Sequence, residues 1–372
     1  MNKTFFNLIQ DVQKNGKCHH CGGCVTFCSA INYGALDLDE TGKPRFGEIE
    51  KCIECGLCYS ICPETEELDL EIKKNLGWEA PYGKMIGTSV SRARDEELRS
   101  RGTDGGIVTA ILTHLFDNGR INGAIVSKNT EDGRIPFLAT TREELMDSAG
   151  SCFHHSHGMT RLAKAYNTFS PSIAALGRFR TGIPDRLAFV GTPCQINTMR
   201  KMQAMGIVPA DAVSYCFGLF CSGNFLFDAE AFRHIENRYQ FRYADVEKIN
   251  IKEDFIFTLY SGASIQVPVD ELDDVKREAC QFCSDFSAEY ADISFGGLGA
   301  ESGWTTAMTR TRLGKEVMAE AMKKVLEPWA HKEGVKAITF AENKVKNACD
   351  VKKQRADAYI ESVSAPKVKI VS

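Results

Sequence analysis

Two runs of closely spaced cysteines lie near the N-terminus. The first run is Cys18-His-His-Cys21-Gly-Gly-Cys24-Val-Thr-Phe-Cys28, and the second is Cys52-Ile-Glu-Cys55-Gly-Leu-Cys58-Tyr-Ser-Ile-Cys62-Pro63. Two-residue gaps let one tight loop place three thiolates around an iron-sulfur cubane, while the last cysteine of each run reaches the other cluster. The spacing therefore predicts two 4Fe-4S clusters. One is held by Cys18, Cys21, Cys24 and Cys62, and the other by Cys28, Cys52, Cys55 and Cys58.

Structural zinc is the alternative for these cysteines. Zinc sites usually divide their ligands into two separated CxxC pairs, whereas each run here carries four cysteines in succession. Ser29 stands where the second run has Pro63, and neither residue is a ligand. The runs therefore favour clusters, and the segment ALDLDETGKPRFG between them predicts a short hairpin.

Seven cysteines follow these runs, and two of them repeat the two-residue gap as Cys280-Gln-Phe-Cys283. A single CxxC is compatible with a redox dithiol or with half of a metal site. Cys194, in a Gly/Pro turn, and Cys221, at the end of an apolar strand, are placed to complete a set of four. Spacing alone leaves both interpretations open.

The composition limits the class of protein. The 372 residues are 43% hydrophobic and 25% charged, with a formal charge of −4, which is typical of a soluble globular chain of about two domains. This balance gives no reason to expect nucleic acid or anionic membrane as the main partner. The most apolar stretch, 212–227, is interrupted by polar residues, so no transmembrane segment is expected. The start MNKTFFNLIQDVQKNG lacks signal-peptide features, which favours the cytoplasm and reduced, metal-binding thiols.

The helices and strands expected around these cysteines divide the chain into three units. Residues 1–80 form a ferredoxin-like domain with two clusters, 84–335 form an α/β domain with a mixed sheet, and 336–372 form a C-terminal helical segment. Asp104 is expected to cap a helix over 104–118 that stops at Gly119, and 121–128 reads as a buried strand. The order of elements predicts an α/β fold with some antiparallel, α+β-like strands.

Further strands are expected at 186–190, 212–221 and 291–297, with a hairpin formed by FIFTLY and SIQVPV. The segment 191–195 is expected to be a tight turn before a helix that opens at 196. Cys194 then lies near a helix N-terminus, which lowers the pKa of a thiol. A charged helix over 342–361 is expected to be solvated or to pack against another subunit.

Several blocks of the larger unit occur together in one order: RGTDGGIVTAIL, AGSCFHHS, VGTPCQINTMRKMQ, LFCSGNF, ACQFCSDF, ADISFGGLG and GWTTAMTRT. From Gly87 to about Trp329, the chain resembles the beta-subunit family of the coenzyme F420-reducing hydrogenase and the F420 dehydrogenases. This resemblance implies an FAD-binding α/β domain that carries its own 4Fe-4S cluster and a site for the deazaflavin coenzyme. Members with an N-terminal double-cluster extension resemble the input modules of F420 dehydrogenases and of deazaflavin-dependent sulfite reductase.

The resemblance also implies site residues. The third cluster would be held by Cys194, Cys221, Cys280 and Cys283, which leaves Cys216 free. The implied FAD contacts are Thr103, Asp104, Gly105, Gly106, Val108, Thr109, Gly296, Gly297, Gly299, Gly303, Trp304, Thr305 and Thr306. Glycines let backbone amides approach a ring or pyrophosphate, and a helix N-terminus favours anions, so the chemistry agrees with these contacts.

The chain departs from the family pattern after the Ala-Gly of the middle block. Relatives often have Lys and Tyr there, whereas this chain has Cys152 and Phe153, followed by His154, His155 and His157. We expect these histidines to make polar loop or cofactor contacts rather than a metal site. Three basic residues, Arg92, Arg94 and Lys128, are candidates for binding the coenzyme tail, against the alternative of solvated surface charges.

These features predict an iron-sulfur flavoprotein oxidoreductase with three 4Fe-4S clusters and FAD. It would pass electrons between coenzyme F420, which exchanges a hydride, and the clusters, toward a partner redox protein or another subunit of a larger complex. Hydride transfer requires no protein acid or base, so no catalytic side chain is predicted. The expected location is the cytoplasm, free or beside a membrane complex through a partner.

Three alternatives remain. The first is a beta subunit of a formate dehydrogenase or heterodisulfide-reductase complex. The second is a ferredoxin-dependent flavin reductase of an organic substrate, and the third is a flavin-free polyferredoxin adaptor.

Overall fold

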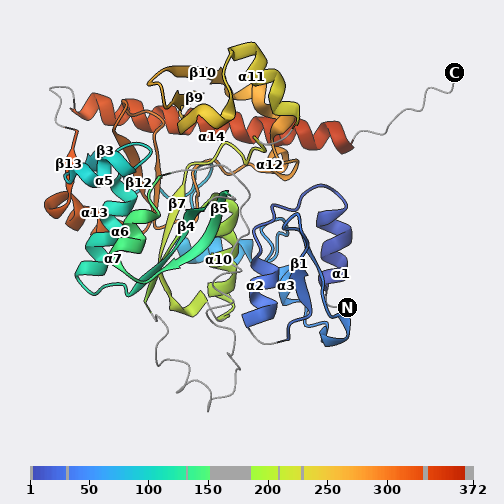
Figure 1. The fold of residues 1–372 in the computed structure, drawn as a ribbon. Helices are drawn as coiled ribbons and strands as arrows, with labels where there is room; N and C mark the ends of the chain where they lie inside the picture. The colour runs from blue at the N-terminus through green and yellow to red at the C-terminus, as the bar shows by residue number, and fades with distance from the viewer. Residues whose placement is uncertain are drawn as a thin grey trace.

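The structure is a computed structural model that describes residues 3–30, 33–130, 133–150, 186–207, 210–227, 230–329 and 334–364. Within these ranges, the centre is an eight-stranded sheet of order β13-β3-β12-β11-β7-β6-β4-β5 (Figure 1). Its strands are β3 (Gly87–Ala93), β4 (Gly123–Thr130), β5 (Gly133–Ala139), β6 (Leu187–Gly191), β7 (Val213–Leu219), β11 (Ile293–Gly296), β12 (Thr305–Thr309) and β13 (Leu326–Pro328). Strands β4, β6, β7 and β11 are parallel, and the other neighbouring pairs are antiparallel. The predicted α/β fold with a mixed sheet is confirmed.

Helices cover both faces of this sheet. Helices α5 (Glu96–Arg101), α6 (Ile107–Asp117), α7 (Arg142–Asp147) and α13 (Arg312–Lys324) share one apolar core with the sheet. Helices α10 (Pro193–Ala204) and α14 (Gly334–Ser364) lie on the opposite face (Figure 1). Successive side chains of β7 point to opposite faces of the sheet. Phe217 packs in the core shared with α6 and α13, whereas Cys216 packs in the core beside α10.

The helix predicted over 104–118 begins later than expected. Helix α6 starts at Ile107, and its N-cap is Gly106 in the left-handed conformation, at φ 70°. A Cβ on Gly106 would lie 2.6 Å from the Leu98 carbonyl oxygen, so this close turn requires glycine. Asp104 therefore does not cap the helix, and the predicted cap is wrong. The predicted stop is confirmed, since α6 ends at Asp117 just before Gly119.

The segment 191–195 is not a free turn, because α10 already begins at Pro193. Thr192 is the N-cap, and its backbone N–H donates to Gln195 Oε1 at 3.0 Å in a capping box. Proline at the first helical position suits this start, since it has no N–H to leave unpaired. Cys194 consequently lies in the first turn of α10, near a helix N-terminus as predicted. Its predicted lowered pKa is wrong, because burial raises the pKa of this thiol to about 11.

The N-terminal unit is built from short elements. They are α1 (Phe5–Leu8), α2 (Gly23–Ala30), β1 (Leu36–Leu38), β2 (Pro44–Phe46), α3 (Leu57–Ser60) and α4 (Asp69–Leu76). Strands β1 and β2 pair as the predicted hairpin, and Asp39 Oδ1 accepts from the backbone N–H groups of Thr41 and Lys43 in the turn. One apolar core joins this unit to α10 through Ile72, Met199 and other side chains. Figure 1 shows the unit against α10.

Lys201 of α10 ties the two units together. Its ammonium is fully buried, donates to the carbonyl oxygens of Cys62 and Thr65, and pairs with Asp69 at 3.0 Å. Replacement of Lys201 by Met removes a buried cation from its partners, and we expect a loss of about 3 kcal/mol of stability. Anaerobic urea unfolding would measure this loss. Lys51→Met, at an exposed ion pair, is the control and should change stability by under about 0.5 kcal/mol.

Beyond the main sheet lie a three-stranded sheet and the C-terminal helix. The small sheet contains β8 (Val246–Ile251), β9 (Asp254–Leu259) and β10 (Ser264–Pro268) and packs against α11 (Arg233–Tyr239). Helix α12 (Ala279–Phe282) packs against α14 through Phe282 and Tyr359. Strands β9 and β10 form the predicted hairpin. Helix α14 is longer than the predicted 342–361, and it buries Ala341, Val345 and Cys349 against its own chain. Within the described ranges, every helix is too short or too polar to span a bilayer.

Candidate redox site

The first group of thiols lies around the start of α2. Cys18 and Cys21 precede this helix, Cys24 lies in its first turn, and Cys62 follows α3. Burial raises the pKa of the Cys24 thiol, and the nearby Cys21, Cys18, Cys58 and Cys62 raise it further. Burial and the same neighbours, Cys21 and Cys18, also raise the pKa of Cys62. The structure thus brings together the four cysteines predicted for the first cluster.

The second group surrounds a small cavity in the N-terminal unit. All four predicted cysteines line this cavity, together with Phe5, Phe27 and Tyr33. Burial raises the pKa of Cys58 to about 12, with additional contributions from Cys55, Cys28 and Cys52. The last cysteine of the first run therefore lies with the first three of the second run, as the exchange between runs predicts.

The third group comes from three separated parts of the chain. Cys194 lies in the first turn of α10, Cys221 follows β7, Cys280 lies in α12, and Cys283 ends that helix. Burial raises the pKa of Cys221 to about 12; Lys352 lowers it, and Cys280, Cys194 and Cys283 raise it. The four thiols that the resemblance groups are thus neighbours in space.

Cys280 is distinguished by its donors. Its burial alone raises the pKa, but His19, the backbone N–H of Asn224 and Lys352 lower the pKa to about 7. The Asn224 N–H donates to Cys280 Sγ at 3.2 Å. Donors of this kind stabilise the thiolate, which is the form that binds metal.

The three groups fit iron-sulfur clusters in donor number and type. Each group offers four thiols, and a cubane takes one thiolate on each of four irons. Within the described residues, no set of three or more His, Cys, Asp or Glu side chains is placed to hold a single metal ion. A cubane does not require its ligands to converge on one point, so this finding does not conflict with the fit.

The first and third groups are adjacent. Cys21 Sγ lies 3.6 Å from Thr198 Oγ1 on α10, the helix that carries Cys194. His19 lies between the groups: its Nε2 lies 2.6 Å from Glu64 Oε1, and its backbone carbonyl accepts from Arg277 at 2.5 Å. Burial alone lowers the pKa of His19, whereas Cys194, Glu64 and Cys280 raise it well above its usual range. The N-terminal unit therefore docks on the third group through its first group.

A cavity of about 270 Å³ opens beside the third group of thiols. Cys221 and Thr192 belong to its wall, and Thr192 Oγ1 lies 3.4 Å from Cys194 Sγ. Eight of the predicted FAD contacts line the cavity: Thr103, Asp104, Gly106, Val108, Thr109, Gly296, Gly297 and Thr305. The start of α6 and the end of β11 thus meet in one wall, next to the thiols.

Five predicted FAD contacts have other surroundings. Gly105 donates its N–H to Thr305 Oγ1 at 2.9 Å, and Thr306 Oγ1 donates to the Leu298 carbonyl. Trp304 packs edge-on against Trp329 and carries the Arg92 guanidinium over its ring. Gly299 abuts Ala341 of α14, and a Cβ at Gly303 would meet open space. These five residues support the wall or lie away from it.

Sequence reasoning missed much of the wall. Additional lining residues include Ser127, Pro136, Ser148, Gly150, Gln195, Phe220, Ser222, Asn224, Ile251 and Lys252. They come from β4, β5, the segment after α7, α10 and the ends of β7 and β8, so only the fold brings them together. The blocks around Cys194 and Cys221 were the available signal, because Gln195, Ser222 and Asn224 fall inside them.

Asn250 of β8 braces the loop before α6. Its side-chain amide donates to the Thr103 carbonyl at 2.7 Å and to Asp104 Oδ1 at 2.8 Å. Burial raises the pKa of Asp104. The positive charge of Lys252 and the hydrogen bond from Asn250 oppose this increase. Asn250 therefore fixes the orientation of a carboxylate in the cavity wall.

Other predicted positions make contacts within the fold. Arg92 pairs with Glu327 at 3.0 Å, Arg94 donates to the Leu326 carbonyl, and Lys128 lies over the Phe137 ring. Cys216 is buried in β7, and Cys349 donates to Ser287 Oγ at 3.4 Å. Cys152, Phe153, His154, His155 and His157 lie outside the described residues.

Three family models match the chain. Two of them describe the beta subunit of coenzyme F420 hydrogenase/dehydrogenase: the model of its N-terminal part matches residues 88–163, and the model of its C-terminal part matches 184–330. A 4Fe-4S dicluster domain model matches residues 10–63, which contain both cysteine runs.

Similar proteins are subunits or parts of F420-linked oxidoreductases. The coenzyme F420 hydrogenase subunit beta of Methanococcus voltae is 30% identical over 243 residues, or 63% of this chain and 80% of that one. The coenzyme F420-dependent sulfite reductase of Methanocaldococcus jannaschii is 28% identical over 325 residues, and the match spans 83% of this chain and 46% of that enzyme's length. A chain of the F420-reducing NiFe hydrogenase complex from Methanosarcina barkeri shares the fold. Its TM-score is 0.64 at 24% identity, covering 77% of this chain and 94% of that chain.

Proposed function

Because this chain belongs to the coenzyme F420 hydrogenase/dehydrogenase beta-subunit family, we propose that it is an iron-sulfur flavoprotein that exchanges electrons with coenzyme F420. The electrons pass between the coenzyme and 4Fe-4S clusters, and then to a partner redox protein or another subunit. The observation that carries the proposal is a shared wall: Cys221 lines the cavity and lies beside Cys194, Cys280 and Cys283.

FAD is the cofactor proposed for the cavity. A bound flavin supplies the conversion between a hydride and single electrons, because it accepts two electrons together and releases them singly. The loop from Thr103 to Gly106 and the first turn of α6 would hold it, since backbone N–H groups at a helix N-terminus suit a pyrophosphate. Gly296 and Gly297 belong to the same wall, where the absence of a side chain lets Phe220 and Asp104 lie close against the end of β11.

The chain's own residues bind, orient and exclude water rather than transfer protons. Phe189, Leu219, Phe220 and Ile251 give the cavity apolar walls that suit an aromatic ring system. A redox group held there would lie next to Cys221 of the third thiol group, and Cys194 of that group lies near Cys21 of the first. We propose the order cavity, third cluster, first cluster, second cluster for the electron path.

Anaerobically purified protein allows a direct test. We expect a yellow flavin to be released on denaturation, about 12 iron atoms per chain, and oxidation of reduced F420 with a viologen as acceptor. Iron without flavin would instead identify a polyferredoxin adaptor. Flavin and iron without F420 oxidation would refute the coenzyme assignment and favour a reductase of another substrate.

Asn250 provides a test of the cavity as the flavin site. Asn250→Ala removes both hydrogen bonds that hold the Thr103–Asp104 loop, and we expect FAD to bind about tenfold more weakly. Equilibrium dialysis followed by flavin absorbance measures this change. Gln266→Ala, at an exposed position of the same small sheet, is the control and should bind FAD as the wild type does. Equal affinity in both variants would argue against a flavin at this loop.

A further inference from the structure

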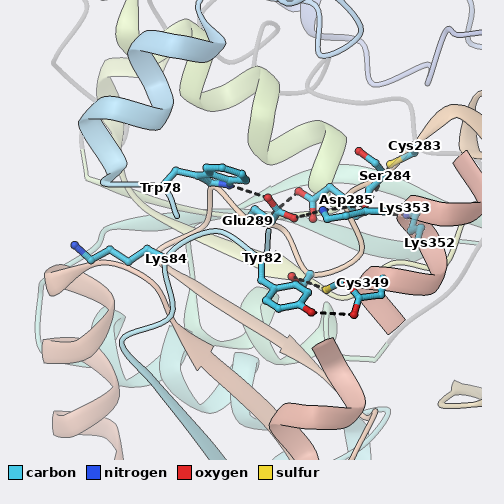
Figure 2. A network of polar contacts seen from close by, with 12 residues as sticks. Trp78, Tyr82, Lys84, Cys283, Ser284, Asp285, Glu289, Cys349, Lys352 and Lys353 are labelled. Atoms are coloured by element: carbon cyan, nitrogen blue, oxygen red, sulfur yellow. Dashed lines mark hydrogen bonds and ion pairs between the residues drawn. The ribbon is translucent and has the colours of Figure 1, made fainter. Parts of the chain in front are cut away.

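Helix α14 places one ammonium group beside the third group of thiols. Lys352 is only 8% exposed, although its residue type is rarely buried. Its Nζ donates to the Cys221 carbonyl at 2.6 Å and to the Asp285 carbonyl at 2.9 Å. Figure 2 shows Lys352 on α14, on the side that faces the segment of Ser284 and Asp285 after α12. The C-terminal helix thus reaches the loops that carry Cys221 and Cys283.

The surroundings of Lys352 differ from those of other lysines on the same helix. Lys353 pairs with Glu289 Oε1 at 2.6 Å, and Lys346 pairs with Glu342 at 2.7 Å. Lys352 instead donates its two hydrogen bonds to carbonyl oxygens, which carry no full charge. Burial alone lowers the pKa of Lys352, yet Cys283, Cys221 and Cys280 raise the pKa above its ordinary value. Asp285 raises the pKa of Lys352 as well, so the positive charge lies among the third group of thiols and this carboxylate.

A neighbouring network fixes this part of α14. Trp78 Nε1 donates to Glu289 Oε2 at 2.7 Å, Lys353 pairs with the same carboxylate, and Tyr82 donates to Asp350 at 2.8 Å (Figure 2). These contacts join the segment before β3, the segment after Cys283 and α14. Because the helix is held from several directions, the ammonium has little freedom to move away from the thiols.

From this placement we infer that Lys352 is a positioning residue that raises the reduction potential of the third cluster. Reduction adds one negative charge to a 4Fe-4S cluster, and a fixed nearby cation in a water-poor site stabilises that charge. Lys352 thereby favours electron transfer from the cavity to the third cluster. The inference rests on the proposed function and assigns to Lys352 an effect on the reduction potential of the third cluster.

Potentiometric titration of the full chain, monitored by electron paramagnetic resonance, tests this role. The signal of the third cluster is identified by its absence in Cys280→Ala. Lys352→Gln retains a side-chain donor but removes the charge, and we expect the ratio of reduced to oxidised third cluster to fall about tenfold at a given potential. This corresponds to about 59 mV toward negative potential for one electron. Lys352→Arg retains the charge and should stay near the wild-type value.

Lys346→Gln is the matched control, because it removes the same charge from the same helix at a half-exposed ion pair. It should leave the third cluster's potential unchanged. A wild-type potential in Lys352→Gln, with full iron content, would overturn the inference and leave the cluster assignment intact. Loss of the third cluster's iron in Lys352→Gln would also overturn it, in favour of a purely structural role. Equal iron and equal spectra in wild type and Cys280→Ala would refute the third cluster itself.

Discussion

Cys280→Ala is expected to lose about four of 12 iron atoms and to stop electron delivery to a viologen, while reduced F420 still bleaches the flavin. Cys280 lies among the third group of thiols, and the cavity reaches that group at Cys221. Removing one thiolate breaks the cluster nearest the flavin but leaves the first turn of α6 untouched. Anaerobic stopped-flow absorbance of the flavin, beside a steady-state viologen assay, separates the two reactions.

The control for this prediction is Cys216→Ala. Cys216 is buried in β7, away from the three groups, and its backbone N–H bond to Asp292 Oδ2 at 2.8 Å survives the substitution. Iron content and viologen reduction should both match the wild type. Unchanged viologen reduction in Cys280→Ala would rule out the third cluster as an obligatory step.

The N-terminal thiol groups could be predicted because their geometry is nearly local. The two-residue gaps fix three cysteines of each group, and the exchange of Cys28 and Cys62 follows from the duplication. The hairpin between the runs likewise depends on a local turn, in which Asp39 accepts from Thr41 and Lys43. Short-range chemistry of this kind is visible in one sequence.

The third group and the cavity depend on contacts between distant segments. Cys194 and Cys283 are separated by β7 and the small sheet, so spacing left their pairing open, and only a family resemblance grouped them. Asn250 and Lys352 carried no sequence signal, since a strand Asn and a helix Lys are ordinary surface residues. Their roles arise from burial against loops that the chain order does not reveal.

A local rule also misplaced one residue. Asp104 precedes a helix and has a capping side chain, yet the left-handed turn at Gly106 moves the helix start beyond its reach. A tertiary contact outweighs the sequence preference there, because the turn at Gly106 lies against the Leu98 carbonyl. The resemblance assigns Trp304 to FAD, and that contact stays a prediction, since its ring packs with Trp329 and Arg92.

Gly297→Ala is expected to abolish FAD retention. A Cβ at position 297 would lie 2.4 Å from Asp104 Oδ2 and 2.9 Å from Asp104 Cγ, closer than such atoms approach in folded proteins. Asp104 is held by Asn250 and borders the cavity, so relief of the clash must turn its carboxylate away from Asn250 or displace the loop at the start of α6. We expect FAD to bind at least about 100-fold more weakly, which corresponds to a loss of about 3 kcal/mol.

Absorbance of the purified variant near the flavin maximum, before and after addition of FAD, measures the effect. Gly87→Ala is the control, because its Cβ would meet only Thr309 Oγ1 at 3.4 Å, an ordinary contact. Both variants should retain about 12 iron atoms, since neither position contacts a cysteine group. A Gly297→Ala protein that holds FAD as tightly as Gly87→Ala would show that the flavin does not rest on the wall formed by Asp104 and Gly297. Loss of FAD with retained iron would instead locate the flavin at this wall, because a general failure to fold would release both cofactors.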